Sequence, residues 1–505
     1  MPATVAREYP LSARQRLIAG AAFALYAAWV ITVGLHHEAW FDEMQAWLLA
    51  RDNSLAALIG TYARYEGTPG LWHAILWLAI RAGLPFSAIW VLSAGFALAA
   101  AAIMLARAPF PLALRIGLLA SWYFGYQYSV VARGYCLDLL LFSIAAALFA
   151  RRAQHPLGYA LTIGLLANVN AFSFLAAGLM GLDLAWRLFA ARRLADPRAL
   201  AALALAAALG LFALWTAWQP ADNGFMNQVS RLNPYASAAV FVANALFDRV
   251  VPWQFTQQTG TEAVSGMLLS AMFLALVARL VWAGRDRALM LALPVVLIVF
   301  AGVVLASSWH GGVLFMAVIF VLWTQWSNPL APRTRRLLVG AFALLEAAQG
   351  VQALEGGLYD IARPYSAGRP AAEAVIAWRA AHPGKTLAAF GGQTFETQPW
   401  LPRNMFDNYH GGAPHPQFVR WNTDETWHAL PHPQEWPALV ATHPDAILAA
   451  HVWLPDRFKR DIAGNACRAG YVLVRSFPAA MVWRGIPENN ALYLMERAAD
   501  GPCRH

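Results

Sequence analysis

The sequence predicts a polytopic α-helical membrane protein that ends in one small polar domain. Two observations predict this class. The 505 residues are 59% hydrophobic and only 13% charged, with a mean hydropathy of +0.45, whereas soluble domains carry about 25% charged residues. Apolar stretches long enough to cross roughly 30 Å of hydrocarbon recur from Leu17 to about Ala353. Together they exclude a purely soluble protein, a disordered chain and a coiled coil.

These stretches predict about eleven membrane spans. A shorter apolar piece, Leu71–Ile80, has only about ten residues, so we expect an interfacial or re-entrant helix there and no crossing. The spans lie near residues 17–35, 86–106, 112–128, 136–150, 157–171, 172–190, 199–218, 263–283, 288–306, 311–326 and 337–353.

The arginines predict the orientation of the spans. Residues 1–353 hold 23 basic and 14 acidic side chains, while residues 354–505 hold 14 of each, so the net charge of +9 belongs to the membrane part. If residues 1–16 form a cytoplasmic tail, arginines fall on every inner loop, as the positive-inside rule requires. We expect a multi-pass protein of the plasma (inner) membrane, with loops 36–85 and 219–262 outside. Lys385 and Lys459 are the only lysines, and nothing indicates a nucleic-acid partner.

The last part of the chain, residues 354–505, predicts an extracytoplasmic domain. Its length suits one domain. A helix is expected over Ala371–Ala381, and strands over Thr386–Phe390, Ala446–Ala450 and Tyr471–Val474. Alternating helix and strand signals indicate a small α/β or α+β unit. If this domain is outside, Cys467 and Cys503 can pair there.

The segment Trp40–Arg51, just after the first span, contains the first candidate for chemistry. Met44, Trp47 and Leu48 share one helical face, which predicts an amphipathic helix on the membrane surface. Asp42 and Glu43 fall at its N-terminus, where acids often cap a helix or complement its dipole. The functional alternative is a carboxylate that serves as general base for an acceptor hydroxyl.

The other polar clusters near span ends also fall on the predicted outer face. An enzyme that acts on a lipid-anchored head group at the outer leaflet needs this arrangement. The clusters are Arg64-Tyr65-Glu66-Gly67-Thr68-Pro69-Gly70-Leu71-Trp72-His73, Tyr126-Gln127-Tyr128-Ser129-Val130-Val131-Ala132-Arg133-Gly134-Tyr135, Asn168 with Asn170, and Ser307-Ser308-Trp309-His310-Gly311-Gly312.

The order of these features resembles the GT-C superfamily of integral-membrane glycosyltransferases. One span is followed by an outer loop with an Asp-Glu pair on a juxtamembrane helix, then a turn with proline and a short helix, then an Ala-Arg-x-Tyr loop. The bacterial branch related to protein O-mannosyltransferases and lipid A aminoarabinose transferases looks most similar. The resemblance covers roughly residues 17–353. It implies inverting sugar transfer from a polyprenyl-phosphate donor to an acceptor (lipid, glycan or protein) on the outer face.

The resemblance also implies roles for single residues. Asp42 matches the family's base or metal and acceptor contact, with Glu43 beside it, and Arg133 and Tyr135 match the loop near the donor. The chain departs from the family in two places. Gly67-Thr68-Pro69-Gly70-Leu71 replaces His-Pro-Pro-Leu, and the second-loop acid has no clear match because Asp138 lies three residues past Tyr135. A divalent cation is therefore possible as a cofactor but is not assigned.

The chemistry of the donor supports an arginine independently of the family. Negative charge grows on the leaving phosphate in the transition state, and arginine offers a permanent, bidentate contact. Arg133 is the first candidate, against a snorkelling role at a span end, and Arg64 is the second. His310 is a candidate phosphate or hydroxyl contact, against a neutral packing histidine. Glu66 and His73 are weaker candidates for substrate binding.

Two other classes of function stay open. A transporter or flippase for a lipid-linked or anionic substrate would show inverted repeats and ionisable residues at mid-span, and neither is evident. A scaffold whose tail binds cell-wall material is the third interpretation. Tryptophans near predicted interfaces indicate an aromatic belt more than a sugar platform: Trp40, Trp47, Trp72, Trp122, Trp253 and Trp309.

Overall fold

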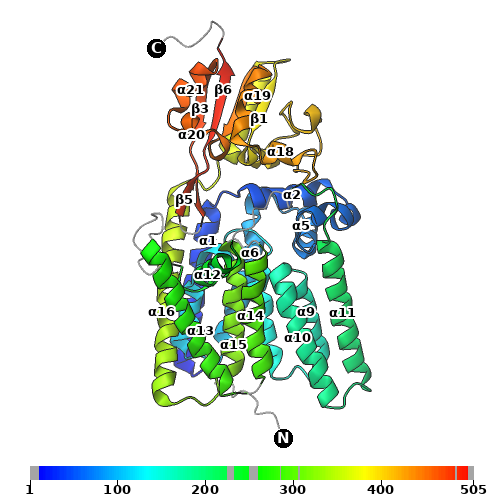
Figure 1. Ribbon diagram of the computed structural model, residues 1–505, viewed down its shortest axis with the longest axis vertical. Helices are drawn as coiled ribbons and strands as arrows, with labels where there is room; N and C mark the ends of the chain where they lie inside the picture. The colour runs from blue at the N-terminus through cyan, green and yellow to red at the C-terminus, as the bar shows by residue number, and fades with distance from the viewer. Residues whose placement is uncertain are drawn as a thin grey trace.

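A bundle of long helices carries a small mixed domain at one end (Figure 1). The computed structural model describes residues 11–224, 233–248, 260–284, 286–304, 308–483 and 486–498. Each of the eleven predicted span ranges coincides with a helix: α1 Ala13–His36, α6 Trp90–Arg107, α7 Leu112–Ala120 with the π-helix η3 Tyr123–Gln127, α8 Cys136–Phe149, α9 Pro156–Ala167, α10 Ala171–Ala190, α11 Pro197–Ala217, α13 Gly260–Trp282, α14 Arg287–Val303, α15 Gly311–Gln325 and α16 Pro332–Ala362.

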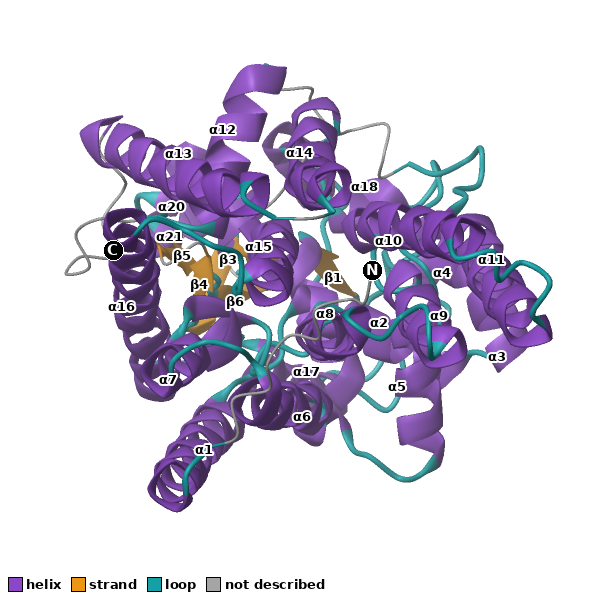
Figure 2. Ribbon diagram, turned by 90° about the horizontal axis from the view of Figure 1, so that it is seen from below, coloured by secondary structure: helices purple, strands orange, loops and turns teal. Residues whose placement is uncertain are grey.

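Six helices of the described residues are long and apolar enough to cross a membrane: 13–36, 86–107, 171–190, 197–217, 264–282 and 332–362. The others are shorter, and α15 is buried along almost its whole length. It lies among α8, α13 and α14 at the centre of the bundle (Figure 2). A helix surrounded by protein can be apolar on every side. This explains why the sequence of α15 resembles a membrane span although the helix is short.

One end of the bundle collects the loops that were predicted to be cytoplasmic. There Arg152 pairs with Asp183 at 2.6 Å, and Arg187 pairs with Asp286. These pairs join the loop after α8, the end of α10 and the start of α14. The C-terminal domain lies at the opposite end (Figure 1). The arginine-bearing loops and the C-terminal domain therefore lie at opposite ends of the bundle, and their orientation in a membrane stays a prediction.

Residues 36–85, the predicted first outer loop, do not cross the bundle. They form α2 Phe41–Asp52, α3 Leu55–Ala57, the π-helix η1 Leu58–Tyr62, α4 Ala63–Tyr65 and α5 Leu71–Arg81, followed by the 3-10 turn η2 Phe86–Ala88. The prediction that α2 lies on the membrane surface is wrong. Every residue from Glu43 to Ala50 is buried, because α5 covers one side of α2 and the C-terminal domain covers another.

The C-terminal domain combines helices with a mixed sheet, which agrees with the predicted α/β or α+β unit. Its sheet has the order β1-β2-β6-β3, with β1 and β2 parallel and β6 antiparallel to both neighbours. The predicted domain border near residue 353 falls within α16, which continues to Ala362. The elements are α17 Gly368–Ala381, β1 Leu387–Phe390, α18 Thr426–Ala429, α19 Trp436–Ala441, β2 Ala446–Ala450, α20 Asp456–Lys459, α21 Ile462–Arg468, β3 Tyr471–Phe477, β4 Ala480–Trp483, β5 Ile486–Asn489, β6 Leu492–Arg497, and the 3-10 turns η6 Gly392–Trp400, η7 His410–Gly412, η8 Pro433–Glu435 and η9 His451–Trp453.

The two faces of this sheet pack differently. Phe390, Ile447 and Met495 form a separate small core with Trp436 and Phe458. Leu387, Leu448 and other residues of the opposite face join the core that continues into the helical bundle. The domain is therefore fused to the bundle by apolar packing. Cys467 is buried, and Cys503, its predicted partner, lies outside the described residues.

Five of the six tryptophans that were expected to form an aromatic belt lie among the described residues. For these five the expectation is wrong. Trp40, Trp47, Trp72, Trp122 and Trp309 are all at most 8% exposed. Tryptophans that are exposed at helix ends instead are Trp186, Trp215, Trp218 and Trp282. The sequence pattern does not distinguish a tryptophan at the membrane interface from a tryptophan that a second domain covers. Both kinds occur near the end of a span.

Candidate active site

Asp42 and Arg133, which are far apart in the sequence, form an ion pair at the junction of bundle and C-terminal domain. Asp42 Oδ2 lies 2.9 Å from Arg133 Nη1. Trp40 is the residue that precedes α2 as its N-cap, so the interpretation of Asp42 as the N-cap is wrong. Asp42 is the second residue of the helix, and its side chain is free of the capping role and aims at Arg133.

Aromatic rings hold the guanidinium of Arg133 in this place. Its carbon lies 5.2 Å from the ring centroids of both Tyr135 and Trp309. Tyr135 stacks on Tyr128, and Trp40 packs against Trp309. A cation over aromatic rings is attracted by their negative faces. The contacts of Arg133 are therefore with the protein, which is not the environment of a snorkelling side chain.

The Gly311-Gly312 pair is required for this aromatic frame. A Cβ atom at Gly312 would lie 2.4 Å from the hydroxyl of Tyr128, and one at Gly311 would lie 2.7 Å from that of Tyr123. A side chain at Gly312 would displace Tyr128, on which Tyr135 stacks. The two glycines thus serve the site through packing.

His310 lies beside the same frame. Its ring packs against Tyr135 at 5.8 Å and stacks on Phe172 at 4.8 Å. Burial and the positive charge of Arg133 lower the pKa of His310 to about 3. The imidazole is neutral at physiological pH, so it can hydrogen-bond a substrate but adds no positive charge.

Glu43 is completely buried, and both its oxygens accept hydrogen bonds from the protein. One oxygen accepts the backbone N–H of Ala132 at 2.5 Å, and the other accepts the backbone N–H of Trp40 at 3.1 Å. The second oxygen also contacts Nε2 of His37 at 3.0 Å. We place Glu43 behind the site, where it fixes the backbone next to Arg133, and not in contact with substrate.

Sequence reasoning missed His37 and Asp360. Nδ1 of His37 lies 2.8 Å from Asp360 Oδ2, and that oxygen also accepts the hydroxyl of Tyr126. The only local signal for His37 was its place at the end of a span, and the carboxylate of Asp360 follows 323 residues later. A contact of this separation has no pattern in one sequence.

Glu66 faces the same region from the turn before α5. One of its oxygens accepts the side chains of Gln45 and Trp421, both at 2.9 Å. Burial raises the pKa of Glu66 to about 7, with a smaller contribution from the charge of Asp42, while its hydrogen bonds and Arg133 oppose the rise. Asp42 and Arg133 are near enough to affect it, so Glu66 belongs to the site.

Two predicted residues point elsewhere. Arg64 donates from Nε to the backbone oxygen of Trp218, at the end of α11. His73 lies within α5 and is buried, and burial lowers its pKa to about 4. Its neighbour Trp72 packs against Gly134, next to Arg133. His73 is therefore a neutral packing residue near the site.

Asp138 does not face the pair either. It accepts Asn170 Nδ2 at 2.9 Å and Ser173 Oγ at 2.6 Å, and it is fully buried. These bonds tie α8 to the start of α10. Asp138 is therefore held by contacts between helices.

The C-terminal domain holds the helix that carries Asp42. The side chain of Gln45 makes two hydrogen bonds with the backbone of Val419, at 2.8 and 2.9 Å. Phe41 packs edge-on against Phe395 and Trp421. Because α2 is held between α5 and the C-terminal domain, the carboxylate of Asp42 has a defined position.

The pKa of Asp42 depends on the charge of its partner, Arg133. Burial raises the pKa of Asp42, the charge of Arg133 opposes the rise, and Glu43 adds to it. Removal of the positive charge of Arg133 would therefore raise the pKa further. The carboxylate would then bind a proton more readily.

The residues present do not assemble a metal site. Among the described residues, no group of three or more His, Cys, Asp and Glu side chains has the geometry to hold an ion. The carboxylate of Asp42 is paired with an arginine.

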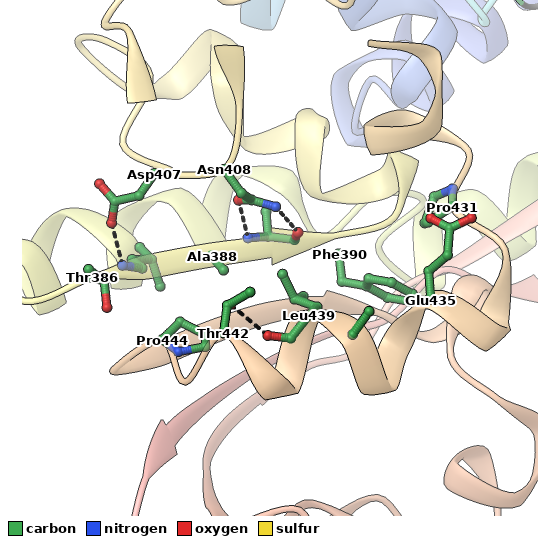
Figure 3. A pocket seen from close by; sticks show the side chains of 13 residues that line it. Thr386, Ala388, Phe390, Asp407, Asn408, Pro431, Glu435, Leu439, Thr442 and Pro444 are labelled. Carbon is green, nitrogen blue, oxygen red and sulfur yellow. Dashed lines mark hydrogen bonds between the residues drawn. The ribbon is translucent and has the colours of Figure 1, made fainter. Parts of the chain in front are cut away.

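A cavity of about 560 Å³ lies wholly in the C-terminal domain (Figure 3). It opens between the edge strand β1 and α19, with Ala388 and Leu439 on its walls and Asp407 and Glu435 at its rim. Asn408 bonds the backbone of Ala389 along this edge. The cavity is separate from the Asp42–Arg133 pair.

The comparison with solved structures gives an informative similarity. The structure matches that of ArnT from Cupriavidus metallidurans bound to undecaprenyl phosphate, with a TM-score of 0.52 at 13% identity. The match covers 98% of this chain and 100% of that one. This chain therefore has the fold of that ArnT structure, in agreement with the predicted resemblance. No protein-family model and no curated protein matches the sequence.

The structural match extends over the whole fold, including the C-terminal domain. The predicted resemblance covered roughly residues 17–353, whereas the structural match extends over nearly all residues. Sequence reasoning could not extend it, because the tail carries no motif and its packing on α2 depends on contacts distant in sequence.

Proposed function

We propose that this protein is a membrane glycosyltransferase that moves a sugar from a polyprenyl-phosphate donor to an acceptor on the outer face. The observation that carries the proposal is the ion pair between Asp42 and Arg133. A base and a phosphate-binding cation are needed a few ångströms apart in such a transfer. The GT-C fold supports it, since the matching ArnT structure holds undecaprenyl phosphate.

In this proposal Asp42 is the general base. It takes the proton of the acceptor hydroxyl as the oxygen attacks the anomeric carbon from the face opposite the phosphate. The new bond joins that carbon to the acceptor oxygen, and the bond to the phosphate oxygen breaks with its electron pair. The leaving polyprenyl phosphate gains one negative charge, and Arg133 stabilises it.

The ion pair couples donor binding to activation of the base. A donor phosphate that binds Arg133 competes with Asp42 for the guanidinium. Its negative charge cancels the influence that lowers the pKa of Asp42, so the carboxylate becomes more basic. The donor is then expected to bind before the acceptor is deprotonated, which limits unproductive activation of the acceptor.

The remaining residues of the site have proposed supporting roles. Tyr135 and His310, which pack beside Arg133, are proposed to line the phosphate, and Glu66, bonded to Gln45 of α2, is proposed to contact the acceptor.

The test is transfer by purified protein in detergent with a polyprenyl-phosphate sugar and an envelope extract as acceptor source. Asp42→Asn keeps the size of the side chain and removes its charge. A general base contributes roughly 100- to 10,000-fold, so we expect a loss in that range with an unchanged melting temperature. Activity within threefold of wild type would remove Asp42 from the reaction.

One observation favours a transporter as the second candidate. Glu346 lies in the middle of α16, inside the bundle, and its Oε1 atom has no hydrogen-bond partner there. Ionisable groups within spans often mark transport paths, and sequence reading had found none. Transfer in detergent separates the two functions, because a flippase needs two compartments. Glu346→Gln should then leave transfer intact.

A further inference from the structure

Three charged side chains form a buried row behind Asp42 and Arg133. His37 stands at the centre, 3.0 Å from Glu43 and 2.8 Å from Asp360. The side chains of all three are at most 1% exposed. They come from the end of α1, the first turn of α2 and the last turns of α16. Three elements that are distant in sequence therefore meet at one imidazole.

An imidazolium is the form that satisfies this geometry. Both ring nitrogens face carboxylate oxygens, so each must carry a proton to form a hydrogen bond. Burial opposes a charge on the ring, but the two carboxylates outweigh this effect and raise the pKa of His37 well above its ordinary value. Buried charges of this kind are stable only when they are paired.

The row ends on the backbone that carries Arg133. Glu43 accepts the N–H of Ala132, the residue before Arg133, and Asp360 accepts the hydroxyl of Tyr126. The loop is thus tied at two points, on either side of Tyr128. The same Glu43 belongs to α2, one residue after Asp42. The distance between base and phosphate contact is set through this row.

We propose that His37, Glu43 and Asp360 are positioning residues that hold Arg133 at the correct distance from Asp42. The inference rests on the proposed function for its effect on transfer. Their hydrogen bonds run to Trp40, Tyr126, Ala132 and one another. They act through the Ala132 amide, so their loss should weaken the contact of Arg133 with the donor and leave the acceptor site as it is.

His37→Gln is the first test, with His36→Gln as the matched control. His36 is exposed, and its Nδ1 lies 2.8 Å from the backbone oxygen of Thr32 in its own helix. We expect His37→Gln to lower transfer about 10- to 100-fold, mainly through a higher KM for the lipid-linked donor. His36→Gln should stay within twofold. An equal loss in both variants would overturn the proposal.

A double-mutant cycle separates positioning from general destabilisation. If His37 acts through Arg133, its substitution should have less than threefold effect in an Arg133→Lys background. Effects that multiply would show that His37 acts independently, against the proposal. Asp360→Asn provides a second variant because it keeps the shape of the side chain. Misfolding of both His37→Gln and Asp360→Asn would assign the row to stability alone.

Hydrogen exchange gives a readout that does not need the proposed function. The amide of Ala132 should exchange faster in His37→Gln than in wild type, while amides of α15 keep their rates. If wild type shows no transfer but this amide responds, the proposed function fails and the positioning contact stands. If wild type transfers sugar and the amide does not respond, the positioning role is refuted.

Discussion

Arg133→Lys tests whether the guanidinium, and not only a positive charge, is needed for the donor. Lysine keeps the charge but cannot form two parallel hydrogen bonds with a phosphate. The aromatic frame adds a second loss, since the flat guanidinium lies 5.2 Å from the rings of Tyr135 and Trp309. An ammonium group on a flexible chain would not be held in the same way.

The expected magnitude follows from these contacts. A hydrogen bond to a charged group contributes about 1.5–3 kcal/mol, and a lost stacking contact adds roughly 0.5–1 kcal/mol. A total of about 2–4 kcal/mol corresponds to roughly 30- to 800-fold in donor kcat/KM. The partly exposed pair with Asp42 is within reach of lysine and contributes little to the difference.

The assay is initial rate against donor concentration with purified protein, together with direct binding of polyprenyl phosphate. Arg81→Lys is the control. Arg81 also lies over a ring, at 4.8 Å from Trp77, but it belongs to the far end of α5. A value of kcat/KM for Arg133→Lys within threefold of wild type, with Arg81→Lys the same, would refute the role of Arg133 as a bidentate phosphate contact.

Three further predictions concern packing, charge and oxidation. Gly312→Ala should lower stability by about 1–3 kcal/mol because of the clash with Tyr128, whereas Gly340→Ala, with open space around it, should not; thermal unfolding compares them. Glu66 has a pKa of about 7 against about 4.3 when unfolded, so its ionisation lowers wild-type stability as pH rises between these values. The melting temperature of Glu66→Gln relative to wild type should accordingly rise from pH 5 to pH 8, and a constant difference would contradict it. Cys467 and Cys503 should pair if the domain faces an oxidising compartment, closing a loop of about 36 residues; peptide mapping without reductant that finds both thiols alkylated would reject this.

The fold class was readable because it depends on composition and on local periodicity. Hydrophobic runs must bury their backbone hydrogen bonds as helices inside a membrane, so each of the eleven predicted ranges became a helix. The same holds for the strands β1 and β2, where short apolar runs lie between turn residues. The short helix α5 followed from length alone, since about ten residues cannot span the bilayer.

The candidate pair was also named from the sequence, but for separate reasons. Asp42 was singled out by its place after the first span, and Arg133 by its place at a span mouth. Their contact at 2.9 Å joins residues whose separation no local pattern describes. The identification of each residue was chemical, and the pairing is a property of the bundle.

Tertiary structure alone decided what covers these residues. Burial of α2 depends on the C-terminal domain, which packs on it through Gln45 and Phe41. Because of this packing, α2 is buried, although the sequence predicts an amphipathic surface helix. Glu43, a catalytic candidate in the sequence, is a buried contact of the backbone. His37 and Asp360 became visible only when α1 and α16 came together. A sequence records which residues are polar, while the burial that makes their charges interact comes from elements hundreds of residues away.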